Sequence, residues 1–200
     1  MGEITSYKMD HRVKSPPKDK SSLIELVKTV FKESKLINIS TDLDQLAFAF
    51  MSFKDWGPAP IAHFDMNFAL ENPDILLNKV GIFFMTVLGQ GSSCYEGLYG
   101  PLPVHGYEHQ LAYLFAFCVY DESLTDKRTD NEAYALFAMF FPRGMSSFIQ
   151  SAYRIIEWIL FRKFQKIKNI NQLTGTLLKD IKDEMKFSIY YWHLLSMGVI

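Results

Sequence analysis

The sequence has few cysteines and almost no net charge, and each shortage excludes classes of protein. Its 200 residues include two cysteines, Cys94 and Cys118, too few for a disulfide scaffold or a four-thiolate zinc site. The formal net charge is -1, so no overall field would attract nucleic acid or an anionic membrane. Any such attraction needs a local patch, and we expect no nucleic-acid partner.

Long apolar runs are also missing. The longest, residues 80–88 and 111–120, are well short of the roughly 20 residues that a membrane-spanning helix needs. We therefore expect a cytoplasmic protein that meets membranes at most peripherally. Hydrophobic residues nevertheless make up 48% of the chain and aromatic residues 15%, far more than a disordered chain carries. The length suits one well-packed domain with an extension.

The strongest pattern in the sequence is the uncharged stretch Ala-Tyr-Ala-Leu-Phe-Ala-Met-Phe-Phe at residues 133–141. A strand places alternate side chains on opposite faces, and here both sets are apolar or aromatic. The stretch therefore predicts an interior strand that is covered on both faces. Residues 46–53 repeat this doubly apolar pattern and predict a second interior strand.

Three further strands complete the predicted sheet. A turn at Trp56-Gly57-Pro58 brings the chain back along residues 59–64. Residues 97–104 contain two prolines, which suit a short edge strand or an extended loop because proline lacks a backbone donor. Residues 111–120 form another apolar strand, and the charged segment 121–131 is predicted to be a loop.

The start of the chain differs in composition from the rest. Residues 1–20 are polar, and we expect a flexible tail there. Gly2 and Ser6 fit the N-myristoylation pattern, although a disordered leader is the simpler interpretation. Residues 21–36 predict an amphipathic N-terminal helix with a capping box at its start. The main domain is expected to span residues 41–200.

Three helices are predicted within this domain. The first spans residues 72–89, where Asn72 can cap the helix and the following Pro-Asp suits its first turn. The second is a single long helix from Ser146 or Ser147 to residue 168. The third spans residues 174–192. Each carries apolar residues at helical spacing, so each is expected to pack against the sheet.

No catalytic motif occurs in the sequence. Cys94 would have to meet His105 or His109 in space to act as a nucleophile or to bind a metal, and no spacing supports this. Asp121 and Glu122 lie in the charged loop and are most simply solvated. We therefore expect no enzyme activity, no metal and no cofactor.

The order of elements after the N-terminal helix is strand, strand, helix, three strands and two helices. Over residues 46–192 this order resembles the longin domain, within the longin, roadblock and profilin-like group. The resemblance rests on topology and pattern rather than on a residue motif. It implies an α+β fold with a five-stranded antiparallel sheet, one helix on one face and two on the other. It also places the first and fifth strands in the middle of the sheet.

What the resemblance implies about function is a non-catalytic interaction module. Such a module binds or regulates a small GTPase, or pairs with a longin or roadblock-type partner or a second copy of itself, in membrane trafficking or signalling. The second strand and the helix after it form the expected surface, since an unpaired sheet edge and nearby apolar side chains favour binding. The predicted partner-binding residues are Trp56, Ile61, His63, Phe64, Leu76, Val80 and Phe83.

A basic patch lies at the end of the long predicted helix. Cations suit the C-terminal end of a helix dipole, and an acidic partner or a phosphate is the alternative interpretation. The basic residues do not look interleaved with exposed aromatics in the way that base stacking needs. The patch consists of Arg154, Arg162, Lys163, Lys166 and Lys168.

Two alternatives to the interaction module stay open on the sequence alone. One is a profilin-like sensor domain, which predicts an enclosed cavity with a few converging polar groups. The other is a thiol-dependent enzyme that uses Cys94, which predicts a reactive thiol of lowered pKa.

Overall fold

The computed structural model describes residues 43–54, 56–88, 96–124 and 131–196. These residues all belong to one compact unit, Asn38–Ile200. The predicted tail, the predicted helix over residues 21–36, the Gly2 motif and Cys94 lie outside the described residues. Among the described helices, none is both long enough and apolar enough to cross a membrane.

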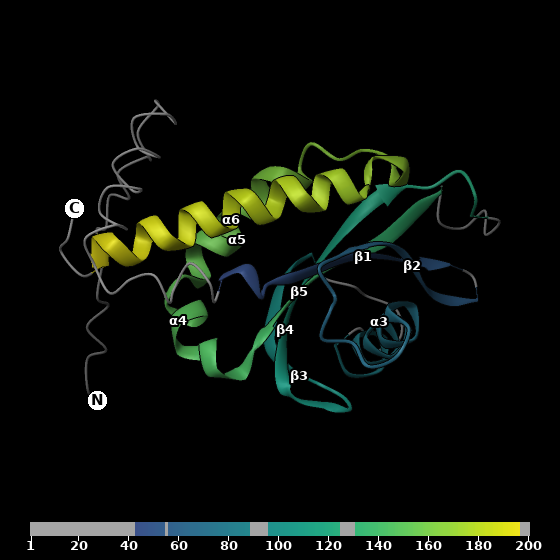
Figure 1. Cartoon of the computed structure of the whole chain (residues 1–200). Helices are drawn as coiled ribbons and strands as arrows, with labels where there is room; N and C mark the ends of the chain where they lie inside the picture. The colour runs from purple at the N-terminus through teal and green to yellow at the C-terminus, as the bar shows by residue number, and fades with distance from the viewer. Residues whose placement is uncertain (1–42, 55, 89–95, 125–130, 197–200) are drawn as a thin grey trace, which may run out of the picture. The chain divides into compact units, whose positions relative to one another are not determined.

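The fold is α+β and is built on a five-stranded antiparallel sheet, as the sequence predicts (Figure 1). The strand order across the sheet is β2-β1-β5-β4-β3. This order places β2 and β3 at the two edges. The strands are β1 (Ala47–Lys54), β2 (Gly57–Phe64), β3 (Gly97–Val104), β4 (Tyr107–Tyr120) and β5 (Glu132–Pro142).

The two doubly apolar segments are the interior strands that their pattern predicts. β1 pairs with β2 and β5, and β5 pairs with β1 and β4. On β1, Phe48 and Phe50 face one side of the sheet while Ala49 and Met51 face the other, and all four are fully buried. Both faces of β1 are therefore excluded from water, which explains why neither set of side chains is polar.

β4 begins at Tyr107, earlier than the predicted start at residue 111. The chain turns tightly at His105 and Gly106, and Val104 then pairs with Tyr107. Gly106 has a φ of 80°, in the left-handed region that a glycine occupies without strain. The turn thus extends the β3–β4 hairpin into the more polar start of β4, where apolar periodicity gives no signal.

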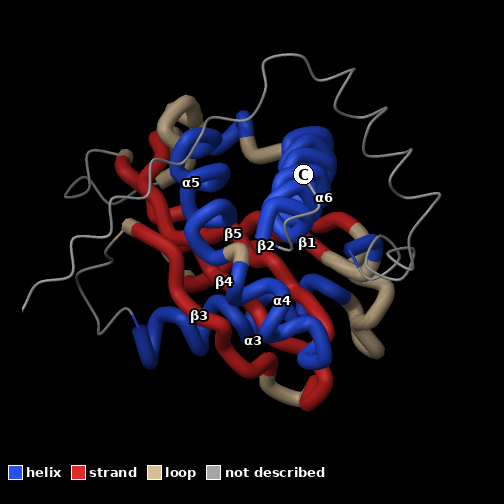
Figure 2. Tube along the Cα trace, turned by 90° about the vertical axis from the view of Figure 1, so that its left-hand side faces the viewer, coloured by secondary structure: helices blue, strands red, loops and turns tan. Residues whose placement is uncertain are grey.

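Helix α3 (Pro73–Phe83) covers one face of the sheet (Figure 2). Leu76, Leu77 and Val80 pack on the face that carries Ala49 and Met51. The predicted cap is confirmed, because the Asn72 side chain accepts a hydrogen bond from the Asp74 N–H at 3.0 Å. The helix does not continue regularly to residue 89. It passes into a π-helical turn, η1 (Phe84–Leu88).

Helices α5 (Tyr153–Phe164) and α6 (Gly175–Ser196) lie on the other side of the sheet (Figure 2). Phe164 of α5 inserts among the rings of the sheet and stacks on Phe117 with a centroid separation of 4.2 Å. Its other ring contacts, at 5.3 to 5.9 Å, are with Phe50, Phe115 and Phe137. This face is an aromatic layer, whereas the α3 face mixes alanines and aliphatic residues with rings such as Phe84 and Phe140.

The predicted single helix over residues 146–168 is wrong in its continuity, and the structure has two helices there. α4 (Ser146–Ser151) ends at Ala152, whose ψ of 7° lies outside the helical range, before α5 begins. The Ser151 carbonyl accepts a hydrogen bond from the Trp192 indole at 3.2 Å, and the Ser151 hydroxyl donates to the Phe148 carbonyl at 2.7 Å. The indole of α6 thus bonds the Ser151 carbonyl at the point where the helix is interrupted.

Candidate interaction surface

A row of exposed apolar side chains runs along the outer side of α3. Ile75 is 48% exposed and Ile82 is 54% exposed. Their separation of two helical turns places them on the same side of the helix. Met85, at 43% exposed, continues this row into η1. The opposite side of α3 is buried in the core, so the helix is apolar on both sides.

Trp56 belongs to the same region of the surface. It is 77% exposed at the turn between β1 and β2. α3 approaches β2 closely, because a Cβ atom added to Gly81 would lie 2.4 Å from the Cβ of Pro58. Trp56 precedes Pro58 by two residues, which places it beside this end of α3. We call Trp56, Ile75, Ile82 and Met85 the α3 surface.

The structure divides the seven predicted partner-binding residues. Trp56 and His63 are exposed, and Ile61, Phe64 and Phe83 are half-buried. The other two predicted residues, Leu76 and Val80, are buried in the core, so they cannot form part of an exposed surface. The apolar pattern of α3 extends around most of the helix, and the sequence could not show which side faces the sheet. The exposed apolar residues of α3 are Ile75 and Ile82 instead.

The edge of β2 is poorly suited to pairing with another strand. Pro58 and Pro60 have no backbone N–H, so they cannot donate to an added strand. Ile61 is left without a pairing residue on β1, because the register shifts between Phe50 and Met51. Prolines and bulges are the usual protection of sheet edges. β3, at the other edge, carries Pro101 and Pro103, in agreement with its prediction as an edge strand.

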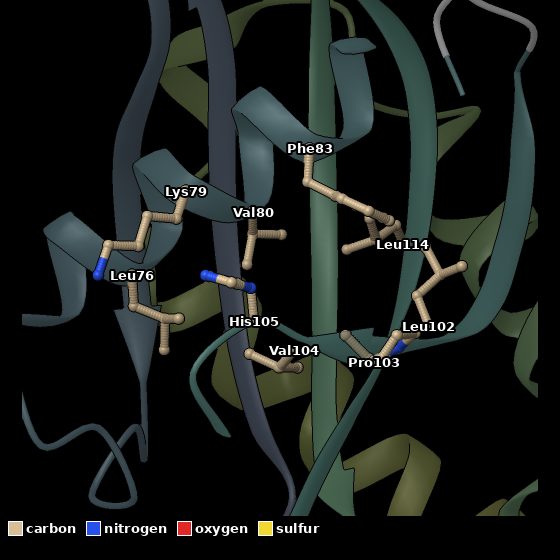
Figure 3. Close-up of a pocket in the computed structure, with 10 residues that line it drawn as sticks. Leu76, Lys79, Val80, Phe83, Leu102, Pro103, Val104, His105 and Leu114 are labelled. Atoms are coloured by element: carbon tan, nitrogen blue, oxygen red, sulfur yellow. The ribbon is translucent and has the colours of Figure 1, made fainter. Parts of the chain in front are cut away.

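A small cavity lies between α3 and the β3–β4 hairpin. In Figure 3, Leu76, Val80 and Phe83 extend from α3 toward the hairpin, where Val104 and Leu114 line the opposite side. Its volume is about 20 Å³, the space of one or two water molecules. Small-molecule sites have volumes of roughly 300–1,000 Å³. This cavity therefore cannot hold the ligand that a profilin-like sensor would need.

Of the residues considered for catalysis or metal binding, His109 and Asp121 lie far apart. His109 lies near the start of β4 and Asp121 lies just past its end, so about 40 Å of strand separates them. His105 lies on the rim of the small cavity, and Cys94 lies outside the described residues. Within the described residues, no group of three or more His, Cys, Asp or Glu side chains could hold a metal ion.

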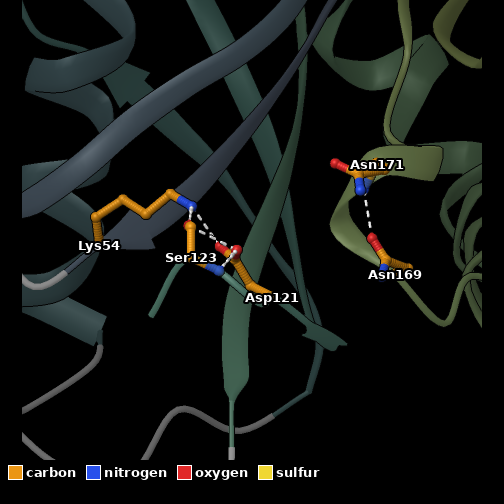
Figure 4. A network of polar contacts seen from close by, with 5 residues as sticks. All are labelled: Lys54, Asp121, Ser123, Asn169 and Asn171. Atoms are coloured by element: carbon orange, nitrogen blue, oxygen red, sulfur yellow. Dashed lines mark hydrogen bonds and ion pairs between the residues drawn. The ribbon is translucent and has the colours of Figure 1, made fainter. Parts of the chain in front are cut away.

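Asp121 is buried, and the expectation that it is solvated is wrong. Figure 4 shows its carboxylate between Lys54 and Ser123. Lys54 donates to this carboxylate and, at 2.6 Å, to the Ser123 hydroxyl. The N–H and hydroxyl of Ser123 donate to the same carboxylate at 2.9 and 2.7 Å. Burial alone would raise the pKa of Asp121, but the hydrogen bonds from Lys54 and Ser123 hold that pKa below its usual value of 3.8.

This network joins the end of β1 to the end of β4 rather than presenting a reactive group. The Asp121 carboxylate accepts from three donors, so the charge is compensated where it is buried. The chain after α5 is attached at the same end of β4, since the Tyr120 N–H donates to the Lys168 carbonyl at 3.0 Å. Asn169 holds this loop in shape by accepting from the Asn171 N–H at 2.9 Å (Figure 4).

No family model, curated protein or solved structure matches this chain. The longin resemblance therefore stays a prediction from element order. The geometry of the described residues is the basis for any conclusion about function.

The predicted basic patch is partly neutralised by neighbouring carboxylates. Arg162 and Lys163 both pair with Glu184 of α6, the latter at 2.9 Å. Arg154 lies 3.4 Å from Glu157, one turn along the same helix. Lys166 and Lys168, which follow α5, are exposed.

Sequence reasoning missed that aromatic side chains are exposed among these cations. Trp158 is 50% exposed and Phe161 is 53% exposed. The spacing of Arg154, Trp158, Phe161 and Arg162 by four, three and one residues places them on one side of a helix, but it does not show whether that side faces the core or the solvent.

Proposed function

We propose that this chain is a non-catalytic protein-interaction module that binds a partner protein through the α3 surface. One observation carries the proposal: Ile75 and Ile82 on α3, Met85 in η1 and Trp56 in the β1–β2 turn are between 43% and 77% exposed, while the other side of α3 is buried in the core. Neighbouring apolar side chains of this size are unusual on a surface that meets only water. Tryptophan is also among the residues that contribute most to binding at protein interfaces.

The α3 surface includes one ion pair. Lys79 lies between Ile75 and Ile82 on the outer side of α3 and pairs with Glu71 at 2.8 Å, which compensates its charge there. The prolines of β2 and β3 argue against strand addition at either edge of the sheet. We therefore infer that a partner contacts the side chains of α3 and Trp56 rather than the backbone of a strand.

The class of partner comes from the resemblance to longin domains. The strand order β2-β1-β5-β4-β3 supports that resemblance, and so does the position of α3 on the side of the sheet opposite α5 and α6 (Figure 2). We infer a partner that is a small GTPase or a longin or roadblock-type protein, including a second copy of this chain. The expected setting is membrane trafficking or signalling in the cytoplasm.

The test measures association of the full chain with itself and with purified small GTPases. Sedimentation velocity reports self-association, and biolayer interferometry reports binding to each GTPase in its GDP-bound and GTP-analogue-bound states. We expect a dimer or a GTPase complex, and we expect Ile82→Asp or Trp56→Ala to weaken it by about tenfold or more, as at interface residues of high energetic contribution.

Leu195→Asp is the matched control, because Leu195 is 40% exposed but lies on α6, on the other side of the sheet. This variant should bind like the wild type. A chain that stays monomeric and ignores every GTPase would overturn the proposal. So would a complex that Ile82→Asp and Trp56→Ala leave unchanged.

A further inference from the structure

Helix α5 carries a second exposed surface, of different chemistry from the first. Arg154, Trp158, Phe161 and Arg162 lie on the side of α5 that faces away from the buried Ile156 and Leu160. Two large aromatic side chains are therefore half-exposed next to two guanidinium groups. We call these four residues, Arg154, Trp158, Phe161 and Arg162, the α5 surface.

The fold does not depend on the two aromatic side chains of this surface. The inward side of α5 already supplies the core with Ile156, Ile159 and Phe164, all of which are buried. Trp158 instead contacts Arg162, whose guanidinium carbon lies 4.7 Å from the centre of the indole ring. A cation above an aromatic face is a favourable arrangement that keeps both groups at the surface. The aromatics thus remain available to a partner.

The surroundings of the α5 surface are positively charged in a chain whose formal net charge is -1. Five cations lie on or directly after α5, and two carboxylates, Glu157 and Glu184, pair with some of them. Three positive charges therefore remain. On the packed helix α6, Lys179, Asp180 and Asp183 are also exposed and together carry one negative charge, so two positive charges remain when they are included. The five cations are Arg154, Arg162, Lys163, Lys166 and Lys168.

We propose that the α5 surface binds the anionic surface of a lipid membrane. Tryptophan and phenylalanine partition into the interface between headgroups and acyl chains. Arginine and lysine extend their charged ends to the phosphates while their stems stay among apolar groups. Basic residues close to an anionic leaflet add further attraction. Trp158 and Phe161 supply the apolar contact, and Arg154, Lys166 and Lys168 supply the electrostatic one.

The geometry favours a membrane over other anionic partners. Nucleic-acid binding commonly uses a positively charged groove that follows the strand, whereas these cations stand on the outward side of a helix in a chain of net charge -1. An acidic peptide would need a groove, whereas these residues stand on the outward side of a helix. A membrane instead offers a broad and deformable surface. Side chains that project from the outward side of α5 can insert into such a surface.

This inference goes beyond the proposed function and does not depend on it. α5 and α3 lie on opposite sides of the sheet (Figure 2). A membrane bound at α5 would leave the α3 surface open to a protein partner. Failure of one proposal would therefore leave the other in place.

The experiment is co-sedimentation of the full, unlipidated chain with vesicles of phosphatidylcholine, with and without phosphatidylserine. We expect binding to the vesicles that contain phosphatidylserine, and weaker binding to them at high salt. The variant Trp158→Ser/Phe161→Ser is expected to lose about tenfold in affinity because the inserted apolar area is gone. Arg154→Ala should lose about fivefold, as expected for one basic residue at an anionic surface.

A second measurement separates insertion from electrostatic adsorption. Tryptophan fluorescence should shift to shorter wavelength when anionic vesicles are added, and Trp158→Phe should remove most of this shift although Trp56 and Trp192 remain. Ile75→Ser/Ile82→Ser removes two comparably exposed side chains from the other side of the sheet and should bind vesicles like the wild type.

Three results would overturn the inference. One is equal binding to neutral and anionic vesicles, and another is unchanged binding by Trp158→Ser/Phe161→Ser. The third is capture of a polyglutamate peptide without capture of vesicles, which would identify an acidic protein as the partner. Circular dichroism verifies that each variant is folded, and the substituted side chains are all exposed.

Discussion

At the scale of single residues, two buried charged side chains, Lys182 and Asp121, connect elements that lie far apart in the sequence. Lys182 of α6 is 5% exposed and donates to the carbonyls of Asp44 and Leu46, each at 2.8 Å, and to the Asp65 carboxylate at 2.6 Å. An ammonium has three donors, and all three are used here. Lys182 therefore attaches α6 to the start of β1 and to the chain just after β2.

Asp121 makes the corresponding connection at the opposite end of β1. The direction of its pKa shift predicts how the free energy of unfolding depends on pH. Its pKa in the folded protein lies below the usual value of 3.8, so the ionised form is favoured by folding. This contribution is present at neutral pH and is lost as pH falls through the folded pKa. We expect Asp121→Asn to cost about 1–3 kcal/mol at neutral pH, since Lys54 loses its charged partner.

The measurement is urea unfolding followed at a series of pH values between neutral and strongly acidic. The difference between wild type and Asp121→Asn should shrink as the solution is acidified. Glu122→Gln is the matched control because Glu122 is exposed and follows directly in the sequence, so this variant should follow the wild type. An equal difference at every pH would show that Asp121 does not act through its charge.

At the scale of elements, α3 is positioned by a residue that has no side chain. Gly81 lets the helix approach β2, since an added Cβ would lie 2.4 Å from the Pro58 Cβ and 3.0 Å from its Cγ. These distances are too short for a real contact, so helix and strand would have to separate.

Substituting this glycine tests the position of α3. Alanine has the higher helix propensity by about 1 kcal/mol, so propensity alone predicts that Gly81→Ala stabilises the protein. We expect the reverse, a net loss of about 1–3 kcal/mol, because the new methyl group overpacks the contact with β2. Unfolding in urea measures this change.

Gly175→Ala serves as its control in α6, where an added Cβ meets nothing within 4 Å. That substitution should be neutral or slightly stabilising. A Gly81→Ala variant at least as stable as the wild type would mean that the helix can shift at little cost, and that its distance from β2 is not set by Gly81.

At the scale of the whole molecule, the two faces of the sheet are covered in different ways. The strands carry alanines such as Ala49 and Ala138 on the α3 face, and rings such as Phe84 and Phe140 pack around them. The other face carries an aromatic layer in which Phe164 touches strands β1, β4 and β5 through Phe50, Phe117 and Phe137. The Phe164 ring thus packs α5 against the three interior strands of the sheet.

A pair of phenylalanines in the same helix tests this view of the core. Phe164 is 4% exposed and Phe161 is 53% exposed, although only three residues separate them. Phe164→Ala should lower the free energy of unfolding by about 3–5 kcal/mol, as expected for a large cavity in a packed core. Phe161→Ala should change it by less than about 0.5 kcal/mol. Similar losses in both variants would contradict the packing described for α5.

The sequence by itself determined the sheet and its interior strands. Residues 46–53 and 133–141 are apolar on both faces, and a strand of that kind is stable only where both sides are covered. The prolines in residues 97–104 indicated an edge strand, and Asn72 indicated the start of α3. These features could be predicted because each depends on neighbours within a few residues.

The tertiary structure decided how these elements face one another and what they expose. α3 is apolar nearly all round, so only its contact with the sheet showed that Leu76 and Val80 are inside while Ile75 and Ile82 are outside. At the break before α5, the Ser151 carbonyl accepts a hydrogen bond from Trp192, which lies 41 residues further along the chain. The burial of Asp121 likewise depends on Lys54, 67 residues earlier in the chain.

The same distinction between local sequence features and tertiary contacts applies to the two candidate surfaces. The sequence indicated Trp56 and the basic end of α5, because an aromatic residue in a turn and a run of cations are local features. The exposed pairs Ile75–Ile82 and Trp158–Phe161 emerged only from the fold. An apolar side chain at helical spacing can face the core or the solvent with the same local pattern. Its burial is set by contacts with residues that lie far away along the chain, and a local pattern does not contain them.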